Sequence, residues 1–202
     1  ALAARTFPDA CPAFLSEEQI AAHIATGLAP ERFAAWQADP RVVLTVAELP
    51  GGLTPGGLAA GADPADAVAP GELVGYSAVL VELPDSAGEP VAGLAPRPAV
   101  VDPPARADGS ALAAELSKVY VDARLRSSGV AATLLERAVR DAASMGVTAL
   151  WLGTHERNRR AQRAYRRRGF RLLGTRTYDV GGQACRDVVM SLNPQEVDNE
   201  QH

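Results

Sequence analysis

Cysteine is scarce in this chain of 202 residues, because only Cys11 and Cys185 are present and they lie far apart in sequence. Two distant cysteines cannot build the disulfide framework of a small secreted domain, and they fit a protein that stays in a reducing cytoplasm. The sequence also lacks an apolar run of the roughly 18 residues that a membrane span needs. Residues 1–13 lack the basic start and long apolar stretch of a secretory signal peptide. We therefore expect a cytoplasmic protein with no membrane partner.

Lysine is nearly absent, since 19 of the 20 cationic side chains are arginine, whereas 39 residues are alanine. This bias is typical of a GC-rich genome, so the number of arginines alone does not indicate a ligand. Hydrophobic residues make up 47% of the chain and charged residues 22%, which is close to the average for folded domains. The composition therefore excludes a disordered, collagen-like or coiled-coil chain, and the length favours a single domain.

The two parts of the chain differ in charge. Residues 1–125 carry 16 acidic against 7 basic side chains, a balance of −9, and residues 126–202 carry 8 against 13, a balance of +5. Such an asymmetry within one domain indicates two ligands of opposite sign. An acidic surface attracts cations, so the first part of the chain is expected to favour a cationic ligand.

Hydrophobic patterning predicts a mixed α/β (α+β) domain. Two segments rich in proline, glycine and alanine, 50–71 and 84–110, are unusually long for loops; they are either surface insertions, which we favour, or a lid over a site. The last two strands are joined by Gly181 and Gly182 and should form a hairpin. Alternating strands and helices predict a central sheet covered by helices. Helices are expected over 16–28, 30–39, 129–145 and 159–168, and strands over 41–49, 72–83, 116–121, 147–152, 170–180 and 183–192.

A short glycine-containing turn connects the predicted strand 116–121 to the helix that follows it. Backbone N–H groups at a helix N-terminus, with a glycine that allows close approach, can hold phosphate oxygens. The pattern is weak by itself, since an ordinary strand-to-helix turn would have the same composition. The turn and the start of the helix contain Arg126, Ser127, Ser128, Gly129, Val130 and Ala131.

A second pattern lies on the next predicted helix, which contains Asn158 and Tyr165 and ends at the pair Gly169 and Phe170. Asn158 and Tyr165 are separated by two helical turns, so they share one helix face about 10 Å apart. One extended ligand could therefore contact both side chains. The alternative is that Tyr165 is a core aromatic that anchors the helix.

The turn at 126–131, the strand before it and the helix at 158–170 together resemble the GNAT superfamily of N-acetyltransferases. The resemblance is strong over 111–192 and holds only in outline before that. It implies a GNAT fold with a mixed central sheet, flanking helices and a C-terminal β-hairpin. It also implies a single acetyltransferase domain over 1–202, divided into an acceptor-side part at 1–110, an acetyl-coenzyme A-binding core at 111–192 and a tail at 193–202.

Two departures from the family pattern are visible. Relatives have a first strand before the helix that contains residues 1–6, and this sequence begins at Ala1 without a methionine, so we expect a trimmed N-terminus. Ala164 precedes Tyr165 where relatives usually carry phenylalanine. The first departure concerns the completeness of the sheet rather than the cofactor site.

The resemblance also assigns roles on the cofactor side. The turn from Arg126 to Ala131 would hold the pyrophosphate of acetyl-coenzyme A, and Asn158 would bond its pantetheine arm. The main chain of Val119 and Val121, splayed at a bulge, would bond the acetyl carbonyl and the pantetheine. Tyr165 would act as general acid at the thioester sulfur, and no metal is expected.

The general base is a separate question. An alkyl ammonium with a pKa near 10 is neutral in only about one part in a thousand at pH 7, so a carboxylate is expected to help remove its proton. Glu115, at the start of the cofactor strand, is the first choice because many relatives carry an acidic residue there. Glu82 is the second choice. Either side chain could instead be an exposed surface carboxylate.

The implied activity is transfer of the acetyl group to a primary amine by direct attack. The runs at 115–121, 151–158 and 187–190 resemble the bacterial branch that includes polyamine acetyltransferases, and together with the acidic first part they favour a small cationic amine. Acetylation of protein or peptide amines, and a non-catalytic sensor of acyl-coenzyme A, are the alternatives; a homodimer is compatible with each. Nucleic acid is not expected despite eight arginines within 157–171, because no aromatic residues alternate with them.

Overall fold

The computed structural model describes residues 2–11, 14–49, 69, 71–82, 89–180 and 183–199. Within these residues one mixed sheet has the strand order β1-β2-β3-β4-β6-β5. Neighbouring strands are antiparallel except β3 and β4, which are parallel. The predicted mixed sheet and C-terminal hairpin are therefore confirmed. The strands are β1 (Val42–Glu48), β2 (Leu73–Val81), β3 (Ala113–Val121), β4 (Ala149–His155), β5 (Arg171–Val180) and β6 (Gln183–Leu192).

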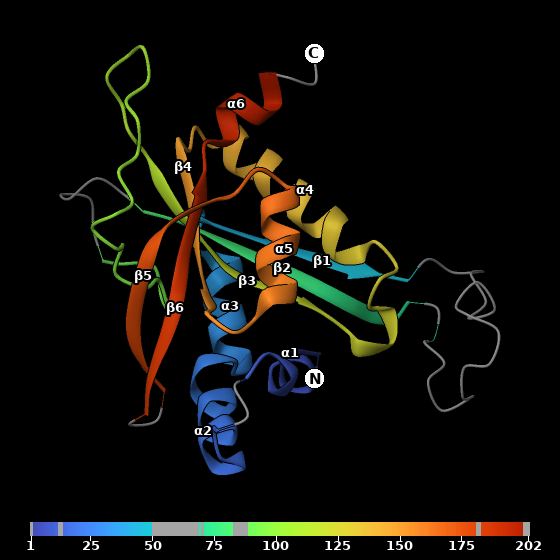
Figure 1. Ribbon diagram of the computed structural model, residues 1–202. Helices are drawn as coiled ribbons and strands as arrows, with labels where there is room; N and C mark the ends of the chain where they lie inside the picture. Colours follow the sequence, from blue (N-terminus) through green and yellow to red (C-terminus); the bar gives the residue numbers. More distant parts are fainter. Residues whose placement is uncertain are drawn as a thin grey trace.

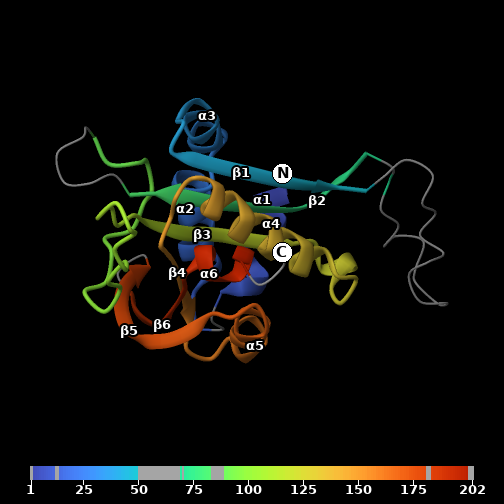
Figure 2. The same cartoon turned by 90° about the horizontal axis from the view of Figure 1, so that it is seen from above.

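Helices cover both faces of this sheet. Helix α4 lies on one face, and α1, α2 and α3 lie on the other (Figure 1). Figure 2 shows the strands side by side from β1 to β5, with α4 lying across the middle of the sheet. No helix in the described part of the chain combines the length and apolarity that crossing a membrane requires. The helices are α1 (Leu2–Thr6), η1 (Pro8–Ala10), α2 (Glu17–Gly27), α3 (Pro30–Ala38), η4 (Ala123–Leu125), α4 (Val130–Ser144), α5 (Arg159–Arg167) and α6 (Pro194–Asn199), of which η1 and η4 are 3-10 helices.

The main hydrophobic core lies between α4 and the sheet. Leu150 and Leu152 of β4 and Phe170, which follows α5, belong to this core. Helix α4 contributes a buried stripe at helical spacing, and burial of that stripe holds the helix and the turn at its N-terminus in place. The stripe consists of Leu134, Leu135, Ala138, Val139 and Ala142.

Most predicted boundaries agree with the structure. Helix α2, for example, begins after Ser16, whose hydroxyl accepts from the Gln19 N–H while the Gln19 side chain accepts from the Ser16 N–H. The predicted start of β3 was wrong, because the strand begins at Ala113 rather than at Leu116. Its first residues lack β-branched side chains, and pairing with β2 and β4 on both sides outweighs their weak strand propensity. Strand β4 likewise extends to His155, beyond its predicted end.

The two proline-rich segments have different outcomes. Segment 50–71 lies outside the described residues, apart from residues 69 and 71. Segment 84–110 is described from residue 89, and residues 89–110 contain no helix or strand, as predicted. It packs on the sheet face opposite α4, where Val101 joins a cluster with Trp151, and Trp36 Nε1 donates to the Ala92 carbonyl at 2.6 Å. Residues 89–110 therefore cover part of that face.

Candidate active site

The strands β3 and β4 separate after a short parallel pairing. Their last paired residues are Glu115 and Trp151. Beyond this point β3 continues to Val121 beside β2, and β4 continues to His155 beside β6. We call the region formed by residues 116–121 and 152–155 the strand divergence. Backbone groups of β3 that face β4 there have no strand partner and are available to a ligand.

A β-bulge lies at the start of the strand divergence. The register between β2 and β3 shifts between Ala78 and Val79, so that Ser117 has no partner residue. Val119 packs in the core beneath α4, and Val121 lies with the residues around the N-terminus of that helix. The structure therefore places the backbone of the predicted residues Val119 and Val121 directly after a bulge and on the strand divergence.

The turn before α4 fits a phosphate group. Two residues in it have left-handed backbones, Ser127 with φ 69° and Gly129 with φ 93°. Gly129 is the N-cap, no side chain caps the helix, and its first N–H groups, including those of Val130 and Ala131, have no acceptor within the helix. A Cβ added to Gly129 would meet no atom within 4 Å. The uncapped helix end therefore faces open space, and its N–H groups and dipole favour an anion.

Charged pairs tie this turn to the N-terminal helices. Arg126 pairs with Asp9 of η1. Asp122, which is buried, accepts from Arg124 at 2.9 Å and from Arg5 of α1 at 2.6 Å. Hydrogen bonds from Arg124, the largest cause, hold the pKa of the Asp122 carboxyl well below its usual range. In the described residues Arg126 thus has a carboxylate partner, and it would have to exchange Asp9 for a phosphate in order to bind one.

Helix α5 carries the second predicted pattern. Asn158 is its N-cap, and Asn158 Oδ1 accepts from the Ala161 N–H at 3.1 Å. The side-chain amide of the buried Gln162 donates to the carbonyls of His155 and Glu156, which fixes the start of the helix against the end of β4. The Asn158 amide nitrogen bonds to no described residue, so this donor remains available for the predicted contact with the pantetheine arm.

Tyr165 is partly buried and packs beside the core. Its ring meets that of Phe170 edge-on, with 5.7 Å between centroids. Burial, with a smaller contribution from Asp187, raises the pKa of Tyr165 to about 12. Its hydroxyl bonds to no described residue. Tyr165 therefore anchors α5, as the alternative interpretation holds, and keeps a proton at neutral pH, as the acid interpretation requires.

Two acidic residues predicted as candidate bases lie on the sheet face opposite α4. Glu115 is buried, and its Oε2 accepts from the Ala95 N–H at 3.0 Å; burial is the main cause of the raised pKa of this carboxyl. Glu82 accepts from Trp151 Nε1 at 2.8 Å and pairs with Arg97 Nε at 3.0 Å. Neither is a free surface carboxylate, and both oxygens of Glu82 are engaged by the protein itself.

A buried ion pair crosses the same face. Asp187 of β6 is 4% exposed, and its Oδ2 lies 3.4 Å from both Nε and Nη2 of Arg176 on β5. The Arg176 guanidinium lies 5.2 Å from the centre of the Trp151 ring, and its Nη2 is 3.9 Å from Glu115 Oε1. A Cβ on Gly153 would lie 2.5 Å from Arg176 Nη2 and 2.7 Å from Asp187 Oδ2. The Arg176–Asp187 ion pair can therefore lie this close to β4 only because Gly153 has no side chain.

Further cations accompany these carboxylates. Lys118 Nζ bonds to the carbonyl and hydroxyl of Ser117 at 3.3 and 3.1 Å. Burial is the largest influence on Lys118 and lowers its pKa, while the nearby Glu115 opposes that shift. Arg32 of α3 also acts electrostatically on Lys118. The charges on the described part of this face are thus mixed rather than uniformly acidic.

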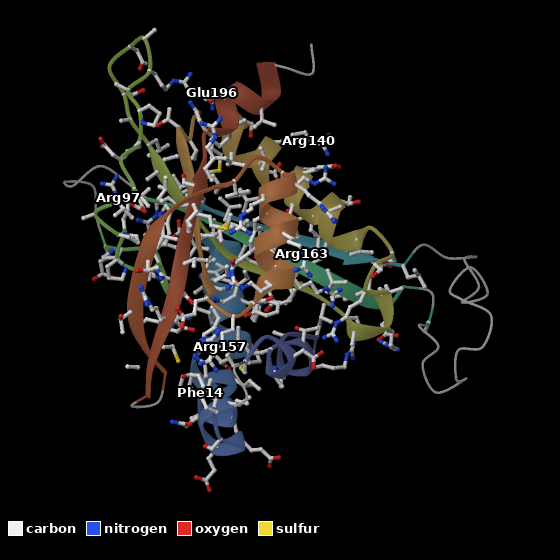
Figure 3. All side chains as sticks on the ribbon, in the orientation of Figure 1. Phe14, Arg97, Arg140, Arg157, Arg163 and Glu196 are labelled. Carbon is white, nitrogen blue, oxygen red and sulfur yellow. The ribbon has the colours of Figure 1, made fainter. Side chains whose placement is uncertain are left out.

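The arginines around α5 form an exposed surface. Arg168 pairs with Glu136 of α4 at 2.6 Å, and the other seven arginines within 157–171 are exposed. In Figure 3, Arg157 and Arg163 lie on the outside of the molecule near α5, with Arg140 on the neighbouring α4. These arginines form a solvated helix face, so we assign them no role in binding nucleic acid.

The sequence patterns do not indicate Asp187, Arg176 or Gly153 as site residues. A signal for the ion pair was nevertheless present in the hairpin. Counting outward from the Gly181-Gly182 turn places Arg176 opposite Asp187, as the structure has it. Nothing in the sequence indicates that this pair approaches β4 at Gly153, because that approach depends on how the hairpin packs in three dimensions.

Comparisons with known proteins agree with this geometry. The model of the Acetyltransferase (GNAT) family matches residues 64–170. An uncharacterized N-acetyltransferase of Mycobacterium tuberculosis (strain ATCC 25618 / H37Rv) is 31% identical over 190 residues, which cover 94% of this chain and 92% of the relative. An uncharacterized N-acetyltransferase of Mycobacterium bovis has the same identity and coverage.

Solved structures share the fold. The PaiA N-acetyltransferase of Thermoplasma acidophilum, in complex with coenzyme A, matches 95% of this chain and 88% of its own, with a TM-score of 0.56 and 15% identity. NAA60 of Arabidopsis thaliana, in complex with a bisubstrate analogue, matches 77% of each chain, with a TM-score of 0.53 and 18% identity. The chain belongs to the GNAT family of acetyltransferases and is an N-acetyltransferase that takes its acetyl group from acetyl-coenzyme A.

Proposed function

We propose that this enzyme transfers the acetyl group to the primary amine of a small cationic molecule by direct attack on the thioester. The observation that carries the proposal is the pair of buried carboxylates, Glu115 and Asp187, on the face of the sheet opposite α4. An acceptor entering on that face would meet these carboxylates together with Arg176 and Lys118, so attraction of a cation would come from the acidic balance of residues 1–125, while the predicted pyrophosphate turn lies at the N-terminus of α4. Opposite charges on the two sides suit an anionic cofactor and a cationic acceptor.

On the cofactor side, the chain would bind mainly through its backbone. The N–H groups of Gly129, Val130 and Ala131 would hold the pyrophosphate, with Ser127 and Ser128 shaping the turn. Arg126 would add a charged contact once released from Asp9, and Asn158 would donate to the pantetheine arm through its side-chain amide. The uncapped end of α4 supports this assignment.

At the reacting centre, the main chain of Val119 and Val121 would orient the thioester. A backbone N–H directed at the developing oxyanion is worth about 3 to 4 kcal/mol in comparable sites. Tyr165 would protonate the leaving sulfur, and its raised pKa keeps the proton available. The sequence assigns removal of the amine proton to Glu115, and the structure offers Asp187 as a second buried carboxylate on the same face.

Among cationic amines, polyamines are our first candidate and aminoacyl or peptide amines are the second. The runs at 115–121, 151–158 and 187–190 support this order through their resemblance to the bacterial branch that includes polyamine acetyltransferases. The acidic balance of residues 1–125 supports a cation more generally.

Release of free thiol from acetyl-coenzyme A, measured with a panel of amines, tests the proposal. The panel contains spermidine, 1,4-diaminobutane, single amino acids and peptides with free N-termini. We expect the highest kcat/KM with a small cationic amine. Binding of coenzyme A without thiol release from any of these amines would instead identify an acyl-coenzyme A sensor, and a preference for peptides would identify a protein acetyltransferase.

A further inference from the structure

One oxygen of Asp187 has no partner in the fold. Its Oδ2 faces Arg176, but its Oδ1 is buried and accepts no hydrogen bond from any described residue. A buried carboxylate oxygen without a donor is unfavourable, and most such groups in folded proteins are satisfied. The orphaned oxygen is therefore a candidate for contact with a donor that arrives with the substrate.

Asp187 lies on β6, next to the strand that borders the strand divergence. Asp187 pairs with His155 across β4 and β6, and the neighbouring Gly153 has no side chain to separate the carboxylate from β4. Strand β4 borders the strand divergence on this side. The side chain of Arg176 reaches over β4, and its Nη2 lies 3.9 Å from Oε1 of Glu115 on β3. Asp187 thus lies on the sheet face opposite α4, which we call the acceptor face because the proposed amine would enter there. Its strand, β6, pairs with one edge of β4, and the other edge of β4 borders the strand divergence.

The other carboxylates of this face are already engaged. Glu115 Oε2 holds the Ala95 N–H, and its Oε1 faces Arg176. Glu82 holds Trp151 and Arg97 with its two oxygens. Glu115 Oε1 makes only the 3.9 Å contact with Arg176 Nη2 and no hydrogen bond, so of these three side chains Asp187 is the one with a buried oxygen that has neither a hydrogen bond nor an ion-pair contact to a described residue.

We propose that Asp187 accepts the proton of the acceptor ammonium through Oδ1, and that Arg176 and Glu115 position it. This assignment rests on the proposed function and replaces Glu115 as the proton acceptor. The ammonium N–H bond breaks and its proton moves to Oδ1, so the nitrogen regains its lone pair. The nitrogen then bonds to the acetyl carbon, the carbon–sulfur bond breaks, and the sulfur takes the proton of Tyr165. The proton lost by the acylated nitrogen restores Tyr165, and the proton on Asp187 leaves to solvent.

The surroundings of Asp187 suit this role. Arg176 and Tyr178 face it from β5, Glu115 from β3, Tyr165 from α5, and His155 pairs with it from β4. Burial, the largest cause, and Glu115 raise the pKa of Asp187, Arg176 opposes them, and the result is about 6. A base is most effective when its pKa lies near the working pH.

Asp187→Asn, measured with two nucleophiles that differ in their need for a base, tests the assignment. The probes are the best alkylamine of the panel above and hydroxylamine, which is largely neutral at pH 7. We expect kcat/KM at pH 7 to fall by about 10² to 10³ for the alkylamine and by less than about tenfold for hydroxylamine. Asp141→Asn, which alters a partly buried carboxylate of α4 that pairs with Arg137 and contacts Thr45 of β1 on the other face of the sheet, is the matched control and should leave both rates unchanged.

Arg176→Gln tests the same assignment through the pH profile of kcat/KM while the proposed base, Asp187, stays in place. Because Arg176 lowers the pKa of Asp187, its removal should move the acidic limb of the kcat/KM profile to higher pH. A smaller loss in Glu115→Gln than in Asp187→Asn would support the assignment. Equal losses with both nucleophiles, full alkylamine activity in Asp187→Asn, or an unmoved limb in Arg176→Gln would overturn it. If the wild-type enzyme binds coenzyme A but acetylates neither probe, the proposed function fails, and this assignment fails with it.

Discussion

The hydroxyl of Tyr165 is the single group on which the proposed chemistry depends most directly. It bonds to no described residue, and burial keeps its pKa at about 12, so it carries its proton through the neutral range. We expect Tyr165→Phe to lower kcat by about 10² or more, with little change in the affinity for coenzyme A. Steady-state kinetics and calorimetry with coenzyme A measure the two effects separately.

Tyr76→Phe is the control for that substitution. Tyr76 is a buried tyrosine of β2 whose hydroxyl also lacks a partner among the described residues. Loss of an unpaired buried hydroxyl should leave the rate unchanged and cost little stability. If Tyr165→Phe retains full turnover, Tyr165 serves only to pack α5 against Phe170.

Gly129 permits a similarly sharp test on the cofactor side. Its φ of 93° strains any other residue by about 1 to 2 kcal/mol, but a Cβ there would meet no protein atom within 4 Å. We expect Gly129→Val to fold and to weaken binding of coenzyme A at least tenfold, because its side chain would occupy the space in front of the α4 N–H groups. Calorimetry on the folded variant measures the loss.

The backbone strain of that variant can be reproduced elsewhere in the molecule. Gly109, in the segment that covers the opposite sheet face, also has a positive φ, 79°, and open space around its Cβ position. Gly109→Val should lose comparable stability and bind coenzyme A normally. Normal binding by Gly129→Val as well would show that the pyrophosphate lies elsewhere.

At the scale of elements, the hairpin β5–β6 depends on a close approach to β4. Arg176 and Asp187 occupy the volume that a side chain on Gly153 would fill. We expect Gly153→Ala to destabilise the protein by about 1 to 3 kcal/mol, because the ion pair must move within a packed interior. Chemical denaturation measures this change.

Gly174→Ala is the matched control on the same hairpin. Its added methyl group would meet only Val100, at 3.4 Å or more, which is close to ordinary contact. It should change the free energy of unfolding by less than about 0.5 kcal/mol. A Gly153→Ala variant as stable as this control would mean that the ion pair can be displaced at no cost.

These elements also show which parts of the fold can be predicted from the sequence. The helices and the hairpin follow from periodicity, caps and turn residues, and the register of the hairpin follows from Gly181 and Gly182. The early start of β3 does not, because it arises from pairing between segments that are distant in sequence. A bulge on this strand was expected only from the family resemblance, and its position at Ser117 is set by the same pairing. The same holds for the approach of Asp187 to Gly153. Local patterns predict the turn before α4 because its geometry is local, whereas the face that carries Glu115 and Asp187 is assembled from several strands.

At the scale of the whole molecule, two buried carboxylates, Asp122 and Asp187, change the stability in opposite directions with pH. Pairing with Arg124 lowers the pKa of Asp122, so its stabilising effect is lost as the pH falls. The pKa of Asp187 is raised from 3.8 to about 6, so its contribution to stability is fully present below pH 3.8 and is lost as the pH rises through about 6. A shift of this size corresponds to about 3 kcal/mol at neutral pH.

We therefore expect Asp187→Asn to be more stable than the wild-type protein at pH 7, by about 1 to 3 kcal/mol. The difference should largely vanish near the ordinary pKa of an aspartate, because the carboxyl is then protonated in the folded state and about half protonated in the unfolded state. Urea denaturation at the two pH values measures it. Asp102→Asn, which alters an exposed aspartate, should show no comparable gain at pH 7. An equal effect of Asp187→Asn at both pH values would contradict the linkage.

The charge asymmetry of the chain leads to a prediction about the acceptor. Residues 1–125 carry a balance of −9, but on the described acceptor face Lys118 and Arg176 accompany Glu115 and Asp187. Any preference for cations must therefore come from the wider acidic surface, which acts over distances comparable to the Debye length of about 8 Å at physiological salt. Such long-range attraction is screened when salt is added, whereas a buried contact is screened much less.

We expect kcat/KM for spermidine to fall severalfold between about 50 mM and about 500 mM sodium chloride, with kcat nearly unchanged, because salt screens the encounter and not the chemistry. The rate with hydroxylamine, which is neutral at pH 7, should change little and serves as the control for general salt effects. A parallel loss for both nucleophiles would show that salt acts on the enzyme or on cofactor binding. A preference for neutral or anionic amines that is insensitive to salt would mean that the acidic surface of residues 1–125 has no part in selecting the acceptor.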